Sequence, residues 1–160
     1  MKDGVPFFQV VPCSPETGDC PWFRGFRARL VDLVQLPTAA RVVDIAYGKG
    51  EFLIRLAEAY GVRGAGVDLS PLFIADAERR LRARVPQAGI TFIQMDGADF
   101  KPDKPNSLTP ASCIGASWVL GGHARTLDAP VGMAEPDGWV IVGSRTGCGS
   151  RRRSTCGRVG

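Results

Sequence analysis

The stretch RVVDIAYGKGEF, residues 41–52, constrains the fold of this chain more than any other. Residues 42–45 are rich in β-branched side chains, which is typical of a short buried strand. Asp44 lies near the end of this strand, and Gly48 and Gly50 follow before an apolar run begins. A turn without side chains lets a ligand lie against backbone, and the next helix offers free N–H groups. The stretch therefore predicts a strand, a ligand-binding turn and a helix in succession.

The same succession repeats along the chain. The strands that we predict are residues 41–45, 62–68, 90–95, 111–117 and 139–143, and the helices are 26–36, 51–60, 70–85 and 123–134. Alternating strands and helices predict an α/β fold, with a parallel sheet between helices on both faces. Such a sheet binds ligands at the carboxyl ends of its strands, where the strand order reverses.

Prolines and glycines sharpen the predicted helix ends. Gly61 is a good stop for the helix that follows the glycine turn. Ser70 and Pro71 read as the N-cap and first position of the next helix. Pro130 lies inside the last predicted helix, where it removes a backbone hydrogen bond. The loop before the fourth strand holds Pro102, Pro105 and Pro110.

Composition excludes several classes of protein. The 160 residues suffice for about one domain, and no apolar run reaches the ~18 residues of a membrane span. The first 20 residues lack the apolar core of a secretory signal, so we expect a soluble, cytoplasmic protein without membrane contact. Five cysteines without a C-x-x-C pair, and one histidine, predict neither a metal site nor a disulfide framework.

The net charge of +4 belongs to the end of the chain. Residues 144–160 hold five arginines and no acid, so 15 basic and 16 acidic residues remain, a net of −1. We therefore predict an irregular segment at 1–25, a ligand-binding domain at 26–143, and a basic tail at 144–160 that is disordered or non-native.

One interpretation of the glycine turn is a dinucleotide site, written G-x-G-x-x-G. Gly48 and Gly50 match its first two glycines, but Leu53 stands at the third, where a bulky side chain opposes close packing under a pyrophosphate. Asp68 could accept a ribose hydroxyl in any nucleoside-binding protein of this architecture. A nicotinamide-dependent oxidoreductase therefore remains an alternative.

Three motifs resemble those of class I S-adenosylmethionine-dependent methyltransferases. They are DIAYGKG at 44–50, GVDLS at 66–70, and Asp96-Gly97-Ala98 after the third strand. The family's first motif is an acid, any residue, then Gly-x-Gly-x-Gly, and Ala46 replaces its first glycine here. The resemblance covers 26–143. It implies a Rossmann-like three-layer sandwich with a mostly parallel central sheet, lacking the last strands of the family's usual seven.

The resemblance implies S-adenosylmethionine as cofactor and a role for each matching residue. Gly48 and Gly50 would border the methionine and sugar, and Asp44 would sit near the amino group. Asp68 would accept bonds from both ribose hydroxyls, and residues 96–98 would read the adenine edge. The implied cofactor-binding residues are Asp44, Ala46, Gly48, Gly50, Asp68, Leu69, Asp96, Gly97, Ala98 and Gly115.

The acceptor side is less defined. Residues 115–118 would face the reactive methyl and a small-molecule acceptor, and we identify no catalytic residue. Tyr47 is either a cation–π partner of the sulfonium or a surface packing residue. His123 is either a general base or a structural residue. Arginines in residues 79–84 are interpreted as a solvated helix face, because no aromatic-interleaved basic stripe of a nucleic-acid site accompanies them.

The tail supports a further hypothesis about the coding frame. Shifted by one base, GC-rich codons for residues 144–160 permit EPYWLREPPPEYLRARG, which resembles how relatives continue after their fifth strand. The strand at 139–143 would then be an uncovered apolar edge, which invites association. The functions considered are methyl transfer, a cofactor-binding remnant without catalysis, the oxidoreductase and, last, nucleic-acid binding by the basic tail, although no nucleic-acid partner is expected.

Overall fold

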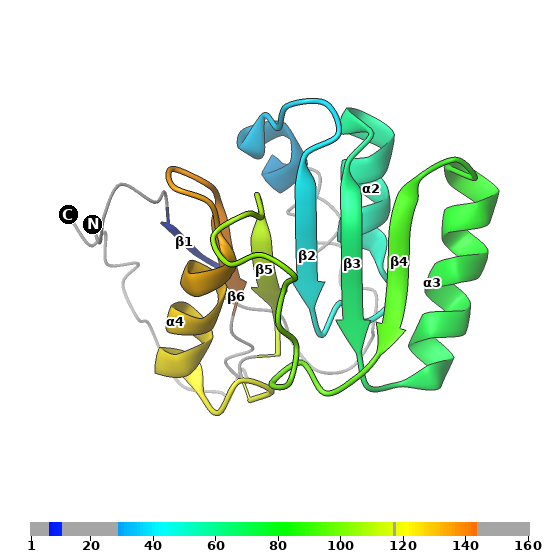
Figure 1. Ribbon diagram of the computed structural model, residues 1–160. Coiled ribbons are helices and arrows are strands. Elements are labelled where there is room, and N and C mark those ends of the chain that lie inside the picture. The colour runs from blue at the N-terminus through cyan, green and yellow to red at the C-terminus, as the bar shows by residue number, and fades with distance from the viewer. Residues whose placement is uncertain (1–6, 11–28, 117, 144–160) are drawn as a thin grey trace, which may run out of the picture.

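The computed structural model describes residues 7–10, 29–116 and 118–143 (Figure 1). These residues form one six-stranded, wholly parallel sheet in the order β1-β6-β5-β2-β3-β4. The strands are β1 (Phe7–Val10), β2 (Arg41–Ile45), β3 (Arg63–Asp68), β4 (Gly89–Gln94), β5 (Ala111–Ile114) and β6 (Val140–Gly143). The predicted parallel α/β fold is confirmed. Strands β2 to β6 begin within one residue of the predicted strands, and β5 ends three residues earlier than predicted.

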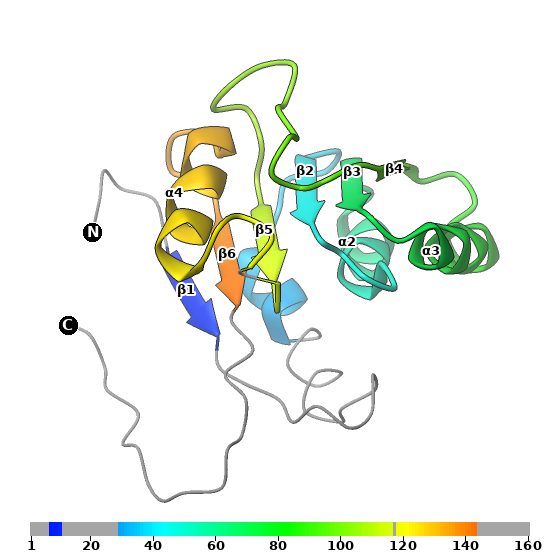
Figure 2. The same cartoon turned by 90° about the horizontal axis from the view of Figure 1, so that it is seen from below.

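Helices cover both faces of the sheet (Figure 2). The helices are α2 (Glu51–Tyr60), α3 (Pro71–Arg84) and α4 (His123–Met133), and residues 29–34 are also helical. On one face, α2, α3 and residues 29–34 bury a cluster that includes Val42 and Leu53. On the other face, α4 packs against β5 and β6 over a cluster that includes Val43 and Val142. The two buried layers and the sheet between them make the predicted three-layer sandwich.

Helix ends follow the predicted caps with one exception. Gly61 takes a left-handed φ of 60° and donates its N–H to Ala57 O, which closes α2. Pro71 stands at the start of α3, as predicted, but the Ser70 hydroxyl makes no capping bond. The Ser70 N–H instead donates to Asp68 Oδ1 at 2.9 Å. Ser70 is thus the N-cap residue, as predicted, but its backbone N–H bonded to Asp68, and not its hydroxyl, organises this helix start.

Strand β1 corrects two predictions. Phe7–Val10 lies within the segment predicted to be irregular, and it pairs in parallel with β6, from Phe7 opposite Val140 to Val10 opposite Gly143. The edge of β6 is thus not uncovered. All four residues of β6 are buried, so its backbone groups need partners that water cannot supply. Four residues are too few to show a period among the surrounding prolines and glycines, so this strand is recognised only through its distant partner.

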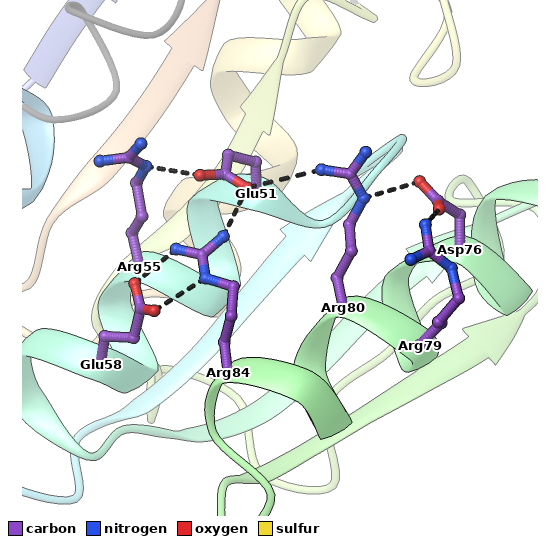
Figure 3. Close-up of polar contacts among 7 residues, drawn as sticks. All are labelled: Glu51, Arg55, Glu58, Asp76, Arg79, Arg80 and Arg84. Atoms are coloured by element: carbon purple, nitrogen blue, oxygen red, sulfur yellow. Dashed lines mark hydrogen bonds and ion pairs between the residues drawn. The ribbon is translucent and has the colours of Figure 1, made fainter.

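Ion pairs join α2 to α3 (Figure 3). The Arg84 guanidinium reaches Glu51 at 2.8 Å and Glu58 at 2.8 and 2.5 Å. Arg79 and Arg80 both pair with Asp76 on their own helix. With Arg82 beside Glu78, each arginine of α3 lies next to a carboxylate, which agrees with the interpretation as a solvated helix face.

Candidate functional site

The predicted site residues gather at one edge of the sheet. The strands β2, β3 and β4 point their carboxyl ends to the same edge (Figure 1). Asp44 is the last but one residue of β2, Asp68 ends β3, and Gly115 directly follows β5. Successive strands run outward from β2 to β4 on one side, and β5 and β6 lie on the other, so the order reverses between β2 and β5. Ligands bind at such reversals in open α/β sheets.

The glycine turn after β2 is left-handed at three positions. Ala46, Gly48 and Gly50 have φ angles of 56°, 60° and 70°. A Cβ on Gly50 would lie 2.9 Å from Ala77 Cβ, so this glycine is needed for packing of α3. A Cβ on Gly48 would meet nothing within 4 Å, so open space lies beside this backbone. Ala46 adopts a conformation that glycine reaches without steric cost.

Asp68 ties the glycine turn to the end of β3. Its Oδ2 accepts the Gly48 N–H at 2.9 Å, and its Oδ1 accepts the Ser70 N–H at 2.9 Å. The Ala46 N–H donates to Val67 O at 2.6 Å beside it. Two of the residues predicted to share a ligand, Gly48 and Asp68, therefore contact each other directly.

Asp44 is buried and bonded to a residue that the sequence analysis missed. Asp44 is 3% exposed and lies opposite Ser112 of β5, which is 1% exposed. The Ser112 hydroxyl donates to Asp44 Oδ1 at 2.7 Å and lies 3.0 Å from Val43 O. Nothing local marks Ser112, because only the β2–β5 register brings it to Asp44. Burial, together with the nearby Asp44 carboxylate, raises the pKa of the buried Cys113 thiol from 9.0 to about 12.

The turn after β4 holds the third predicted group. Asp96 is exposed, and its Oδ1 accepts the Ala98 N–H at 2.9 Å. Gly97 is buried, and a Cβ there would lie 2.4 Å from Ile45 Cγ2. Gly97 is thus required for packing under β2, while Asp96 presents its carboxylate to solvent. Leu69, after β3, leaves 66% of its surface exposed at the same edge.

Tyr47 lies within the glycine turn, but its side chain is buried and not at the surface. It is 4% exposed, and its ring centroid lies 4.8 Å from that of Phe92. Its hydroxyl has no hydrogen-bond partner among the described residues. Burial, followed by the Asp68, Glu78 and Asp44 carboxylates, raises the pKa of Tyr47 well above its usual range. The prediction of surface packing is wrong, because the ring fills the layer between the sheet and α3.

The loop after β5 carries the remaining predicted residues. Gly115 has a φ of 83° and donates its N–H to Gly143 O at 2.8 Å. Trp118 is 63% exposed, so an indole ring stands open to solvent beyond this strand. The His123 side chain and the tail at 144–160 lie outside the described residues, so their predictions stay as they were.

Leu53 separates this turn from a dinucleotide site. Its side chain is fully buried, and a Cβ on Gly66 of β3 would lie 2.8 Å from Leu53 Cδ1. The close approach of helix and strand thus uses a glycine on the strand, while a leucine occupies the third fingerprint position on the helix.

The chemistry of this edge suits a ligand rich in hydrogen-bond donors. Exposed or half-buried carboxylates at Asp68 and Asp96 accept hydroxyl and amino protons, and they favour a positively charged ligand. Leu69 offers apolar surface to a flat ring. The described residues contain no group of three His, Cys, Asp or Glu side chains able to hold a metal ion. No described helix is long and apolar enough to cross a membrane.

The matching family model and two similar solved structures are methyltransferases. A family model described as methyltransferase domain matches residues 42–129. An S-adenosylmethionine-dependent methyltransferase from Thiobacillus denitrificans, solved with S-adenosyl-L-homocysteine, is 36% identical with a TM-score of 0.67. A Geobacter sulfurreducens methyltransferase, also with S-adenosyl-L-homocysteine, is 31% identical with a TM-score of 0.67.

A curated relative is the uncharacterized protein YjhP of Escherichia coli, 30% identical over 116 residues. Its solved structure has a TM-score of 0.69 to this chain. The matches cover 72–76% of this chain but 46–49% of these relatives, so the chain spans about half their length. The family model covers more than half of the chain, including the glycine turn and both later acidic motifs, and the chain therefore belongs to the methyltransferase domain family.

Proposed function

We propose that this chain binds S-adenosylmethionine at the carboxyl edge of β2, β3 and β4. We further propose that the whole protein transfers the methyl group of this cofactor to an acceptor. The observation that carries the proposal is the contact between Asp68 and the open backbone at Gly48, 2.9 Å apart. Relatives with the same fold were crystallised with the demethylated form of this cofactor.

The residues present fit such a ligand. Asp68 uses two of its roughly four lone-pair sites on Gly48 and Ser70, which leaves acceptor capacity for ribose hydroxyls. The space beside Gly48 admits a ligand against the backbone, and Gly50 lets the turn pack on α3. Ala46 begins the same turn, and its φ is also left-handed.

The remaining roles follow the strand ends. We assign Asp44 to the amino group of the methionine portion and the 96–98 turn to the adenine edge. Leu69 would lie against the adenine face, and Gly115 would border the reactive end. When bound, the cofactor supplies a methyl group on a sulfonium, so the chain's own contribution is to orient the cofactor against an acceptor.

The proposed acceptor is a small molecule, and the proposed location is the cytoplasm. The arginines of α3 pair with carboxylates of α2 and α3, which argues against a phosphate-binding surface there. The buried, free thiol of Cys113 suits a reducing compartment. Because the chain covers only about half the length of its relatives, a cofactor-binding remnant without catalysis is a second candidate function. Leu53 disfavours the oxidoreductase.

Calorimetric titration with S-adenosylhomocysteine tests the proposal. We expect the full chain to bind, and Asp68→Ala to bind about 10- to 100-fold more weakly, because a hydrogen bond to a charged group is lost. Asp103→Ala is the matched control, since it removes an exposed acid from the loop before β5 and should bind like the parent chain. Absence of heat with a folded parent chain would refute cofactor binding by this chain.

A further inference from the structure

The pair Asp44–Ser112 joins the two strands between which the sheet order reverses. Asp44 on β2 and Ser112 on β5 are direct partners in the parallel register. The Ser112 hydroxyl holds Asp44 Oδ1 at 2.7 Å. This bond therefore bridges the two adjacent strands at which an open α/β fold has its ligand crevice.

Both partners are buried, so the bond restrains the carboxylate strongly. Asp44 and Ser112 are 3% and 1% exposed, and little water reaches either side chain. A carboxylate taken out of water needs bonds to keep its charge and orientation. The hydroxyl has a single proton, and it lies 2.7 Å from the carboxylate and 3.0 Å from Val43 O, so the charged acceptor is favoured.

The position of Asp44 connects this bond to the ligand. Asp44 lies on β2, two residues before the left-handed Ala46. The turn that follows β2 brings the Gly48 N–H to the Asp68 carboxylate. A rotation of the Asp44 carboxylate would change the direction of its negative charge at the turn. Ser112 opposes that rotation through one of the two carboxylate oxygens.

We propose that Ser112 is a positioning residue that orients the Asp44 carboxylate toward the amino group of the bound cofactor. The inference rests on the proposed function. Ser112 itself touches no ligand in this proposal. It acts through Asp44, and its effect is confined to ligands that carry the amino-acid end.

Two ligands separate this role from a merely structural one. S-adenosylhomocysteine carries the amino-acid end, whereas 5′-methylthioadenosine has the same adenine, ribose and thioether without it. We expect Ser112→Ala to weaken S-adenosylhomocysteine binding about tenfold and to change 5′-methylthioadenosine binding less than about twofold. Ser112→Thr keeps the hydroxyl and should restore most of the lost affinity.

Thr109→Val is the matched control. Thr109 is also a buried hydroxyl beside this sheet, but it accepts the Trp139 N–H near the opposite end of β2. Calorimetry and a thermal melt on all variants decide the outcome. The inference is overturned if Ser112→Ala weakens the binding of both ligands equally, or if it leaves S-adenosylhomocysteine binding unchanged. In either case, binding of S-adenosylhomocysteine by the parent chain still supports the proposed function. A parent chain that binds neither ligand overturns the proposed function first.

Discussion

At the scale of single residues, the glycine turn contains one residue with a side chain in a backbone conformation that favours glycine. Ala46 has a φ of 56°, in the left-handed region that costs an L-residue roughly 1–2 kcal/mol. Alanine offsets part of this cost, because it has less backbone freedom than glycine in the unfolded state and therefore loses less on folding. Ala46 is thus the strained member of a turn whose other left-handed residues are glycines.

Ala46→Gly is expected to stabilise the fold by about 0.5–1 kcal/mol, the difference between these two effects. For a chain of this size, such a gain raises Tm by about 1–4 °C in a thermal melt. Ala59→Gly is the control, since Ala59 is exposed within α2 and its replacement should cost about 1 kcal/mol. Opposite signs for the same substitution would identify backbone conformation as the cause, and a loss of stability in Ala46→Gly would contradict it.

At the scale of elements, the ion pairs between α2 and α3 hold the start of α2 in place. Gly50 supplies no side-chain cap, so the first residue of α2, Glu51, is restrained by Arg55 and Arg84 instead (Figure 3). Arg84 also bonds Glu58 with two nitrogens, a geometry stronger than a single contact. The helix that follows the glycine turn is thereby fixed to α3.

Arg84→Ala should destabilise the chain by roughly 1 kcal/mol, at the upper end for partly exposed pairs because it breaks a network. Arg82→Ala should stay within about 0.5 kcal/mol, since Arg82 contacts Glu78 on its own helix at 3.5 Å. Urea unfolding at low salt and at 1 M NaCl measures both, and the difference should shrink in salt because the charges are screened. If the two variants lowered the free energy of unfolding equally, the ion pairs between α2 and α3 would contribute no more to stability than a pair within one helix.

At the scale of the whole molecule, β1 forms the edge of the sheet beside β6. It pairs with β6 along the full length of both strands. Without β1, the buried strand β6 would present an unpaired edge, a template for pairing with another chain.

A chain without residues 1–10 should therefore associate as its concentration rises and melt at a lower temperature than the full chain. Light scattering over a concentration series measures the association, and a chain lacking only residues 1–5 retains β1 and is expected to stay like the full chain. A shortened chain that remains monomeric and equally stable would mean that β1 contributes nothing to protecting β6.

Much of this architecture was predictable because its signals are local. The acid-ended strands, the glycine turn and Gly61 each act within a few residues, so β2, β3, α2 and α3 appear where expected. The family resemblance from the motifs at 44–50, 66–70 and 96–98 was confirmed by the match over 42–129. The misplaced side chain of Tyr47 depends on Phe92, which another element, β4, contributes.

The sequence by itself determined the alternation of elements and the gathering of Asp44, Asp68 and Asp96 at one edge, because parallel strands bring their carboxyl ends together. Only the tertiary structure decided that Ser112 holds Asp44, that Phe7–Val10 covers β6, and that Tyr47 is buried. These three depend on the register and order of strands far apart in the chain. Burial of backbone and side chains in the assembled sheet selects that order, and no local pattern encodes it.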